Sequence, residues 1–229
     1  MSSLTINVVS EGPSDFPLIK GVVDEIARRQ KKEVTCNLLE PQISASGQKG
    51  GWKNIRNWCW NQSRKPAGLD LLFFRADILL IQMDTDISDG LSLDGKEWPG
   101  GDTQERKNWC ASALNSWLGA FYSDERLIYL LSTMSIETWL LSTYGPENAP
   151  DYFSRQVPDY ETIPDPEGCL LELGYERKRS SSIKLKKNSP LFEDDPRYRQ
   201  RLQNNLDTAR NRCPELDQFC HFLESYTKP

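Results

Sequence analysis

The polar and apolar pattern at the start of the chain predicts a strand, a turn, a helix and a second strand. Residues 4–9 alternate in polarity and are rich in β-branched side chains, which is typical of a strand. Residues 11–15 (EGPSD) have the composition of a turn, and apolar side chains at helical spacing follow over residues 17–29. A second strand is predicted over residues 33–39. This order of elements indicates the start of a parallel sheet.

The pattern predicts further elements along most of the chain. Residues 77–83 form a compact apolar run that suits a buried central strand, and it ends abruptly at Asp84-Thr85-Asp86. Loops are predicted over the Gly- and Ser-rich residues 40–51 and over the polar stretch that follows Asp86. The other predicted elements are helices over residues 52–64, 68–75, 103–120 and 136–143, a strand over residues 126–131, and a last helical stretch over residues 196–226.

Together these elements predict an α/β fold with a mostly parallel central sheet, flanked by helices, and a C-terminal helical extension. The chain has 229 residues, which is enough for one sizeable α/β domain with an elaborated tail. We expect residues 1–150 to form the domain that contains the sheet, and residues 151–229 to pack against it as an extension.

Composition places the chain among globular cytoplasmic proteins. Hydrophobic residues make up 38% and charged residues 27%, so we expect a packed core rather than disorder. The N-terminus lacks the basic and apolar regions of a signal peptide, and the apolar runs are too short to span a bilayer, so no membrane partner is expected. Six cysteines are scattered without a CxxC pair, which indicates reduced thiols.

Charge and residue usage narrow the chemistry to carboxylates. A formal net charge of −5 argues against a protein that coats nucleic acid through its overall field. It is compatible with a nuclease, because bound cations offset the charge of carboxylates that hold them. The single histidine, His221, argues against a His-based metal site or a Ser-His-Asp triad. Late in the chain, residues 177–187 form a basic run that is a candidate phosphate-tracking strip.

Three carboxylates follow the carboxyl ends of predicted strands, where parallel sheets place their sites. Glu11 follows the first strand, and Asp84 and Asp86 follow the central strand. Residues two apart in extended backbone point to the same side, so Asp84 and Asp86 are expected to present their carboxylates together. Such groups repel one another unless cations neutralise them, and Mg²⁺ or Mn²⁺ is the natural neutraliser. The pattern therefore predicts a divalent-metal site.

Three further carboxylates are candidates with an alternative interpretation. Asp15 is either a ligand of a second metal or a helix cap. Asp89 is either a further ligand or a turn residue. Glu137 is a candidate site residue, although a carboxylate in the first turn of a helix also interacts favourably with the helix dipole.

Two segments of the chain resemble the motifs of Toprim domains. Residues 8–15 (VVSEGPSD) resemble the first motif, a hydrophobic strand followed by E-G-x-x-D/E. Residues 78–86 (ILLIQMDTD) resemble the second, a hydrophobic strand followed by D-x-D. Residues 135–141 (SIETWLL) also resemble an E-x-W-L-L signature of small, stand-alone Toprim-like proteins. The resemblance covers about residues 4–145, and it includes the OLD-family nucleases.

The resemblance implies a Toprim-like Rossmannoid fold with a catalytic domain over residues 1–150. It implies that Glu11, Asp84 and Asp86 bind Mg²⁺ and serve phosphoryl transfer. OLD-type nucleases also use a lysine after the carboxylates. Here the candidates are Lys184, Lys186 and Lys187, and Lys184 is the one chosen. Ile183 and Leu185 alternate with Lys184 and Lys186, so a strand could present those two lysines on one face.

The implied function is a metal-dependent endonuclease or nickase that cleaves nucleic-acid phosphodiesters, with DNA expected in preference to RNA. Small Toprim-like proteins occur in bacterial abortive-infection and anti-phage defence systems, often beside an ABC/SMC-type ATPase, so such an ATPase is the implied partner. Two alternatives remain open. One is a catalytically inactive Toprim-like subunit that binds a partner or senses a signal, and the other is a primase-like nucleotidyltransferase.

Overall fold

The computed structural model describes residues 3–41, 50–119, 124–145, 159–176, 185 and 196–227. The chain forms two compact units. Unit 1 comprises Met1–Phe16 and Lys31–Ser132, and unit 2 comprises Pro17–Gln30 and Thr133–Pro229. The boundary expected between residues 150 and 151 lies outside the described residues.

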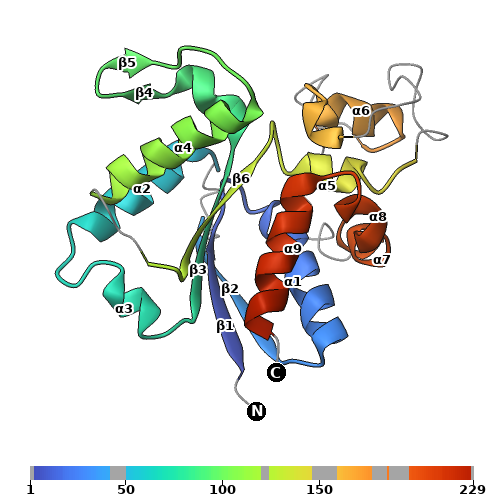
Figure 1. The fold of residues 1–229 in the computed structure, drawn as a ribbon, viewed down its shortest axis with the longest axis horizontal. Helices are drawn as coiled ribbons and strands as arrows, with labels where there is room; N and C mark the ends of the chain where they lie inside the picture. Colours follow the sequence, from blue (N-terminus) through green and yellow to red (C-terminus); the bar gives the residue numbers. More distant parts are fainter. Residues whose placement is uncertain are drawn as a thin grey trace. The chain divides into compact units, whose positions relative to one another are not determined.

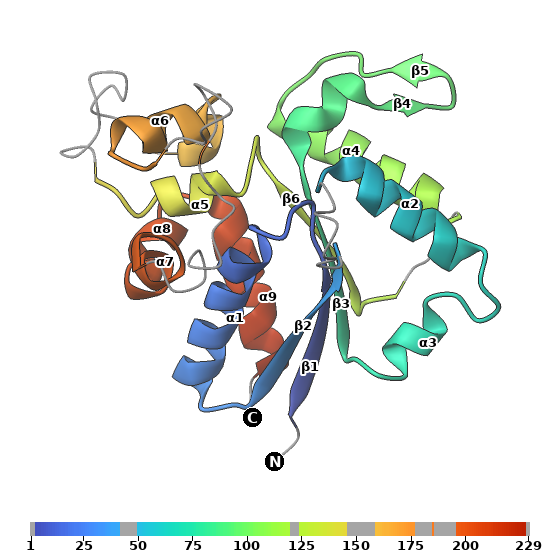
Figure 2. The same cartoon turned by 180° about the vertical axis from the view of Figure 1, so that it is seen from behind.

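Among the described residues, unit 1 is built on a four-stranded parallel sheet (Figure 1, and from behind in Figure 2). Its strands, in the order β2-β1-β3-β6, are β1 (Leu4–Val9), β2 (Val34–Glu40), β3 (Ile78–Asp84) and β6 (Leu127–Ser132). β1 and β3 are neighbours in the middle of the sheet and pair from Ile6 and Ile78 to Val9 and Ile81. The predicted α/β fold with a parallel sheet is confirmed, and the arrangement is Rossmann-like.

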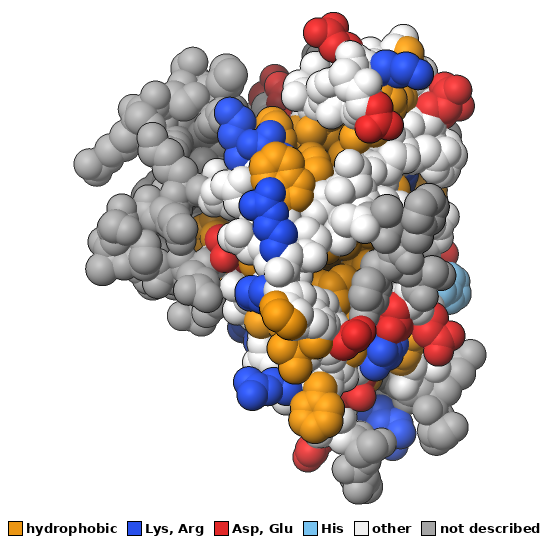
Figure 3. Space-filling view, turned by 90° about the vertical axis from the view of Figure 1, so that its left-hand side faces the viewer, with side chains coloured by type: hydrophobic (Ala, Val, Ile, Leu, Met, Phe, Trp, Pro, Cys, Tyr) orange, Lys and Arg blue, Asp and Glu red, His pale blue; other side chains and the backbone are white. Residues whose placement is uncertain are grey.

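Three helices of unit 1 follow the predicted ones: α2 (Trp52–Ser63), α3 (Asp70–Phe73) and α4 (Thr103–Leu118). α2 and α4 lie side by side in both views of the ribbon (Figures 1 and 2). The side of unit 1 that carries these helices also exposes hydrophobic side chains (Figure 3). Trp60, Leu71 and Phe74 have exposed fractions of 38%, 58% and 89%.

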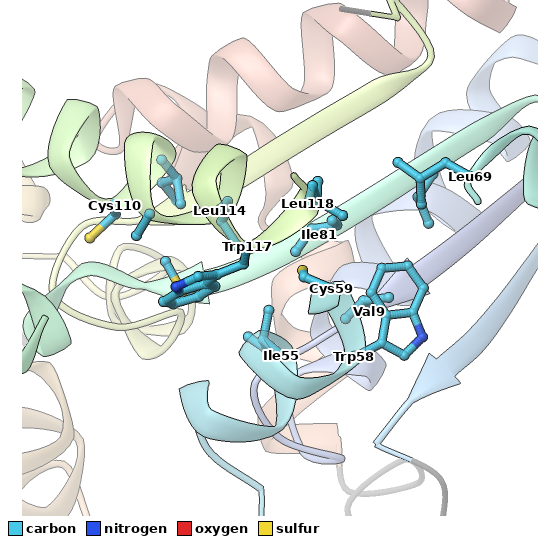
Figure 4. Close-up of a cluster of buried hydrophobic side chains, with 14 of the residues drawn as sticks. Val9, Ile55, Trp58, Cys59, Leu69, Ile81, Cys110, Leu114, Trp117 and Leu118 are labelled. Carbon is cyan, nitrogen blue, oxygen red and sulfur yellow. The ribbon is translucent and has the colours of Figure 1, made fainter. Parts of the chain in front are cut away.

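The inward faces of α2 and α4 pack against the sheet in one hydrophobic cluster (Figure 4). Trp58 and Cys59 enter it from α2, and Leu114 and Trp117 enter it from α4. From the sheet come side chains of alternate residues, such as Ile81, because successive strand residues point to opposite faces. This packing fixes both helices against the sheet.

The polar loop predicted after Asp86 contains more structure than expected. A two-stranded antiparallel hairpin joins β4 (Ser92–Leu93) to β5 (Lys96–Glu97). Its turn residues, Asp94 and Gly95, have φ angles of 51° and 74°. Asp-Gly is the sequence signal for such a turn, because both central residues need positive φ. The prediction of a loop without secondary structure was wrong here.

Unit 2 is mostly helical in the part that the structure describes. α1 (Phe16–Gln30) belongs to unit 2 from Pro17 onward. The others are α5 (Glu137–Leu141), α6 (Pro166–Glu172), α7 (Arg201–Asn204), α8 (Leu206–Arg210) and α9 (Pro214–Thr227). The stretch predicted over residues 196–226 is helical but interrupted, since Pro214 disfavours helical backbone at Cys213 and suits the first position of α9. No helix among the described residues is both long and apolar enough to cross a membrane.

Buried polar contacts hold the start of α9 within unit 2. The backbone N–H of Glu215 donates to Oε1 of Glu161 at 2.5 Å, and the N–H of Thr133 donates to Oε2 of Glu215 at 3.0 Å. Both glutamates are less than a tenth exposed. Buried carboxylates require such donors, because an unsatisfied charge in the interior is costly. These contacts account for the burial of the two acids.

All six cysteines are free thiols, and five of them are buried. The buried five are Cys59, Cys110, Cys169, Cys213 and Cys220. Burial raises the pKa of each of these thiols, to about 12 in Cys59 and about 11 in Cys169. Only the thiolate reacts rapidly with disulfide reagents, so these five thiols are expected to be slow.

We therefore predict that one thiol per chain, that of the half-buried Cys36, reacts rapidly with an aromatic disulfide at pH 8. The other five should react only after denaturant is added. The release of the coloured thiol measures both phases, and Cys36→Ser should remove the rapid one. Two or more rapid thiols in the native protein would contradict the burial described above.

Candidate functional site

Glu11 and Asp84 meet at the carboxyl edge of the sheet. β1 ends at Val9 and its neighbour β3 ends at Asp84, so the residues that follow both strands emerge at the same edge. The backbone N–H of Asp84 donates to Oε2 of Glu11 at 3.2 Å. The side chain of Glu11 thus reaches from the end of β1 to the end of β3. The structure brings these two predicted site residues together.

A buried glutamine joins the same two residues. Gln82 lies on β3, and its side chain is fully buried. Its Oε1 accepts from the backbone N–H of Glu11 at 3.0 Å, and its Nε2 donates to Oδ1 of Asp84 at 2.9 Å. The side-chain amide therefore fixes the backbone of one acid and the carboxylate of the other. Sequence reasoning missed Gln82, although it is the one polar residue among the buried residues of β3 and that signal was available.

The turn after β1 is closed by its own side chains. Asp15 is 5% exposed, and its carboxylate accepts from the N–H of Gly12 at 2.7 Å and from the hydroxyl of Ser14 at 3.2 Å. The hydroxyl of Ser10 donates to the carbonyl of Gly12 at 2.8 Å. These contacts give Asp15 a role in holding the turn that presents Glu11. Its assignment as a second metal ligand stays a prediction.

The chain entering α2 lies directly against this turn. The N–H of Gly51 donates to the carbonyl of Glu11 at 2.7 Å. A Cβ atom on Gly50 would stand 2.7 Å from the same carbonyl oxygen and 3.0 Å from Cα of Gly12. Gly50 is thus a position where only glycine permits the close approach of two backbone segments.

Asp86 does not continue the extended backbone of β3. β3 ends at Asp84, and Thr85–Gly90 form a 3₁₀ helix, η1. The expectation that the backbone from Asp84 to Asp86 is extended was therefore wrong. Side chains three apart eclipse one another in a 3₁₀ helix, so Asp86 and Asp89 instead share a side of η1. Both are exposed.

Electrostatics at Cys110 connect η1 with the turn after β1. Cys110 lies on α4, and burial raises the pKa of its thiol to about 12. The positive charge of Arg106 opposes this rise, and the negative charges of Asp86 and Glu11 add to it. Charges from three elements of unit 1 therefore act on one buried thiol. Sequence reasoning did not identify Arg106 as a site residue. A signal was available, because a cation so near the start of a helix interacts unfavourably with the helix dipole.

The remaining candidates are Glu137 and Lys184. Glu137 lies in unit 2 as the first residue of α5, and it is 3% exposed. The neighbouring Trp139 stacks on Phe219 of α9 with 5.8 Å between ring centroids, so part of the E-x-W-L-L segment serves packing. Lys184 lies outside the described residues.

The acids of unit 1 suit a hard divalent cation in chemistry. Among the described residues, no group of three or more His, Cys, Asp or Glu is arranged to hold a metal ion. Mg²⁺, however, is usually bound through one or two carboxylates together with water and substrate phosphates. The contacts named above involve Oε2 of Glu11 and Oδ1 of Asp84. A carboxylate has about four lone-pair sites, so these contacts are compatible with coordination.

No protein-family model, no curated protein and no solved structure matches the chain. A functional proposal therefore depends on the geometry at the carboxyl edge of the sheet and on the motifs of the sequence.

Gly50→Ala should disturb the turn that carries Glu11, because the added methyl group would meet backbone atoms that cannot rotate away. We expect a loss of stability of roughly 1–3 kcal/mol, as for overpacking in a tight site. Gly90→Ala is the matched control, since nothing lies within 4 Å of its added Cβ. Urea unfolding measures both variants, and equal stability of the two would contradict the close approach.

Gln82 can be tested by two substitutions with different pH dependence. Gln82→Leu removes both hydrogen bonds, and we expect it to cost roughly 1–3 kcal/mol at any pH. In Gln82→Glu the new carboxyl can donate to Asp84 only while it is protonated, and it repels Asp84 once ionised. The destabilisation by Gln82→Glu should therefore be larger at pH 8 than at pH 5. Urea unfolding in the presence of EDTA measures the destabilisation at both pH values. A pH-independent effect would contradict the hydrogen-bonded bridge that Gln82 forms between Glu11 and Asp84.

Proposed function

We propose that the protein is a metal-dependent endonuclease or nickase that cleaves nucleic-acid phosphodiesters. The observation that carries the proposal is the meeting of Glu11 and Asp84 at the carboxyl edge of the sheet, through the 3.2 Å contact and the shared Gln82. Open α/β sheets bind their ligands at this edge. Two adjoining acids held by a buried amide are suited to a cation and a phosphate.

In this proposal each residue has a defined task. Glu11 and Asp84 would hold Mg²⁺ or Mn²⁺, which would polarise a phosphoryl oxygen and lower the pKa of water, and Asp86 on η1 would add negative charge to the site. Glu11 orients the attacking water by accepting a hydrogen bond from it. Gln82 keeps the carboxylate of Asp84 in place. Arg106 supplies positive charge, which would stabilise the negative charge that develops on the phosphate during cleavage.

Phage defence beside an ABC/SMC-type ATPase is the setting we propose for this activity. It rests on the likeness of residues 135–141 to the third Toprim-like signature. The proposed catalytic chemistry is independent of it.

A second candidate is a subunit that binds a partner without catalysis. The exposed hydrophobic side chains of Leu71, on α3, and of Phe74, directly after it, favour this reading, since exposed apolar surface often marks a contact. Calorimetric titration with Mn²⁺ separates the two candidates. Binding that is lost in Asp84→Asn supports the nuclease, and the absence of binding supports the partner subunit.

Glu11→Gln and Asp84→Asn should each reduce cleavage at least about 100-fold while the fold stays intact. Both substitutions keep an oxygen acceptor for the contacts seen here, from the N–H of Asp84 and from Nε2 of Gln82. Asp94→Asn is the matched control, because it removes the same charge at an exposed hairpin turn whose positive φ asparagine tolerates.

The measurement is cleavage of supercoiled plasmid, single-stranded DNA and tRNA with Mg²⁺ or Mn²⁺, with thermal melting to verify folding. If Glu11→Gln cuts at the wild-type rate, the site is wrongly assigned.

A further inference from the structure

One stretch of this acidic chain carries no acidic residue. The protein has 33 Asp and Glu and a net charge of −5, yet residues 41–69 contain neither acid. The same stretch includes Lys53, Arg56, Arg64 and Lys65. The net negative charge of the protein repels an anionic partner. Positive charge concentrated in one segment therefore indicates that such a partner would bind there.

Within this stretch, cations and aromatic rings alternate along α2. Trp52, Arg56 and Trp60 follow one another at intervals of four residues, which places them on one face of the helix. The guanidinium of Arg56 lies 5.1 Å from the ring centroid of Trp52 and 4.8 Å from that of Trp60. Nζ of Lys53 lies 5.7 Å from the Trp52 ring. We call Trp52, Lys53, Arg56 and Trp60 the α2 stripe.

The core does not account for the α2 stripe as a whole. The hydrophobic cluster uses a different face of α2, through Ile55, Trp58 and Cys59 (Figure 4). Trp52 is shared, since it also stacks on Trp117, whereas Trp60 is 38% exposed. On the side of unit 1 that carries α2, Lys and Arg side chains alternate with hydrophobic ones (Figure 3).

The cations of the α2 stripe are not neutralised by the protein in the part that the structure describes. Neither Lys53 nor Arg56 forms an ion pair with a carboxylate there. Nε of Arg56 is buried and has no hydrogen-bond partner among the described residues. Because Nε itself is buried, an external anion would have to bind the other nitrogens of the guanidinium, and Arg56 as a whole is only partly buried.

The α2 stripe begins at the proposed catalytic edge. Gly51, the residue before α2, donates to the carbonyl of Glu11, so Trp52 and Lys53 start immediately beside that turn. A helix of this length extends ~18 Å away from it. A strand bound along α2 would thus have one end at the carboxylates.

We infer that the α2 stripe binds single-stranded nucleic acid, with phosphates on Lys53 and Arg56 and an unpaired base stacked on Trp60. Exposed rings between cations are the features that proteins use for single strands, since every base offers a face for stacking. A duplex hides those faces, so it fits the stripe poorly. This inference rests on the proposed function only for the cleavage of the bound strand, because binding is measured separately from cleavage.

The test is fluorescence anisotropy with a labelled 20-nucleotide oligo(dT) or oligo(U), in EDTA so that cleavage does not interfere. Arg56→Gln should weaken binding several-fold and lower the dependence on salt by about one unit of slope. Trp60→Leu should weaken it about tenfold, whereas Trp60→Phe, which keeps an aromatic face, should stay near wild type. Comparison of the affinities for oligo(dT) and oligo(U) shows whether DNA or RNA is preferred.

Lys32→Gln is the matched control for charge. Lys32 precedes β2, at the opposite edge of the sheet from Glu11, and its loss should leave binding unchanged. Each variant is accepted only if its thermal melting matches wild type. The inference is overturned if wild type fails to bind either oligonucleotide at low salt, if a duplex of equal length binds as tightly, or if Lys32→Gln weakens binding as much as Arg56→Gln.

The two proposals fail separately. Glu11→Gln should lose cleavage and keep oligonucleotide binding. If wild type binds the oligonucleotide through the α2 stripe but cleaves no substrate, the nuclease proposal is rejected and the binding inference stands. Another outcome is that wild type cleaves while Arg56→Gln and Trp60→Leu change neither cleavage nor oligonucleotide binding. That result would reject nucleic-acid binding by the α2 stripe and leave the nuclease proposal standing.

Discussion

The candidate site depends on one buried amide. Gln82 stands in a strand whose other buried residues are apolar, and its amide is satisfied by Glu11 and Asp84. A buried amide without partners would cost several kcal/mol, so this side chain constrains both neighbours as strongly as they constrain it. The parallel register of β1 and β3 places the three residues within reach. The spacing between the two acids follows from that register.

The bridge also explains how two acids can share one edge. Like charges at short range destabilise a fold unless a donor, a cation or protonation compensates them. Here the backbone N–H of Asp84 and the amide of Gln82 each donate to a carboxylate oxygen. Neutral donors reduce the repulsion without cancelling the charge. The edge therefore remains attractive to a cation, which is the property that the proposed chemistry requires.

α2 contributes both to the core of unit 1 and to the proposed nucleic-acid-binding surface. One face of this helix carries Trp58 and Cys59 into the core, while Arg56 and Trp60 lie toward the outside. The backbone N–H of Gly51, directly before α2, binds the carbonyl of Glu11 in the turn of the candidate site. Packing of the inner face thus holds the outer face in a fixed relation to Glu11. A surface helix that is anchored at both its core face and its end can guide a ligand toward one point.

The sequence alone determined the local elements, because helix and strand periodicity is a property of neighbouring residues. It located β1, β3 and α4 closely, and it identified Glu11 and Asp84 as acids at strand ends. Only the tertiary structure decided that Gln82 links them, that Asp86 leaves the strand for a 3₁₀ turn, and that α1 belongs to unit 2. These features depend on register and packing between segments far apart in the chain, which no local pattern contains.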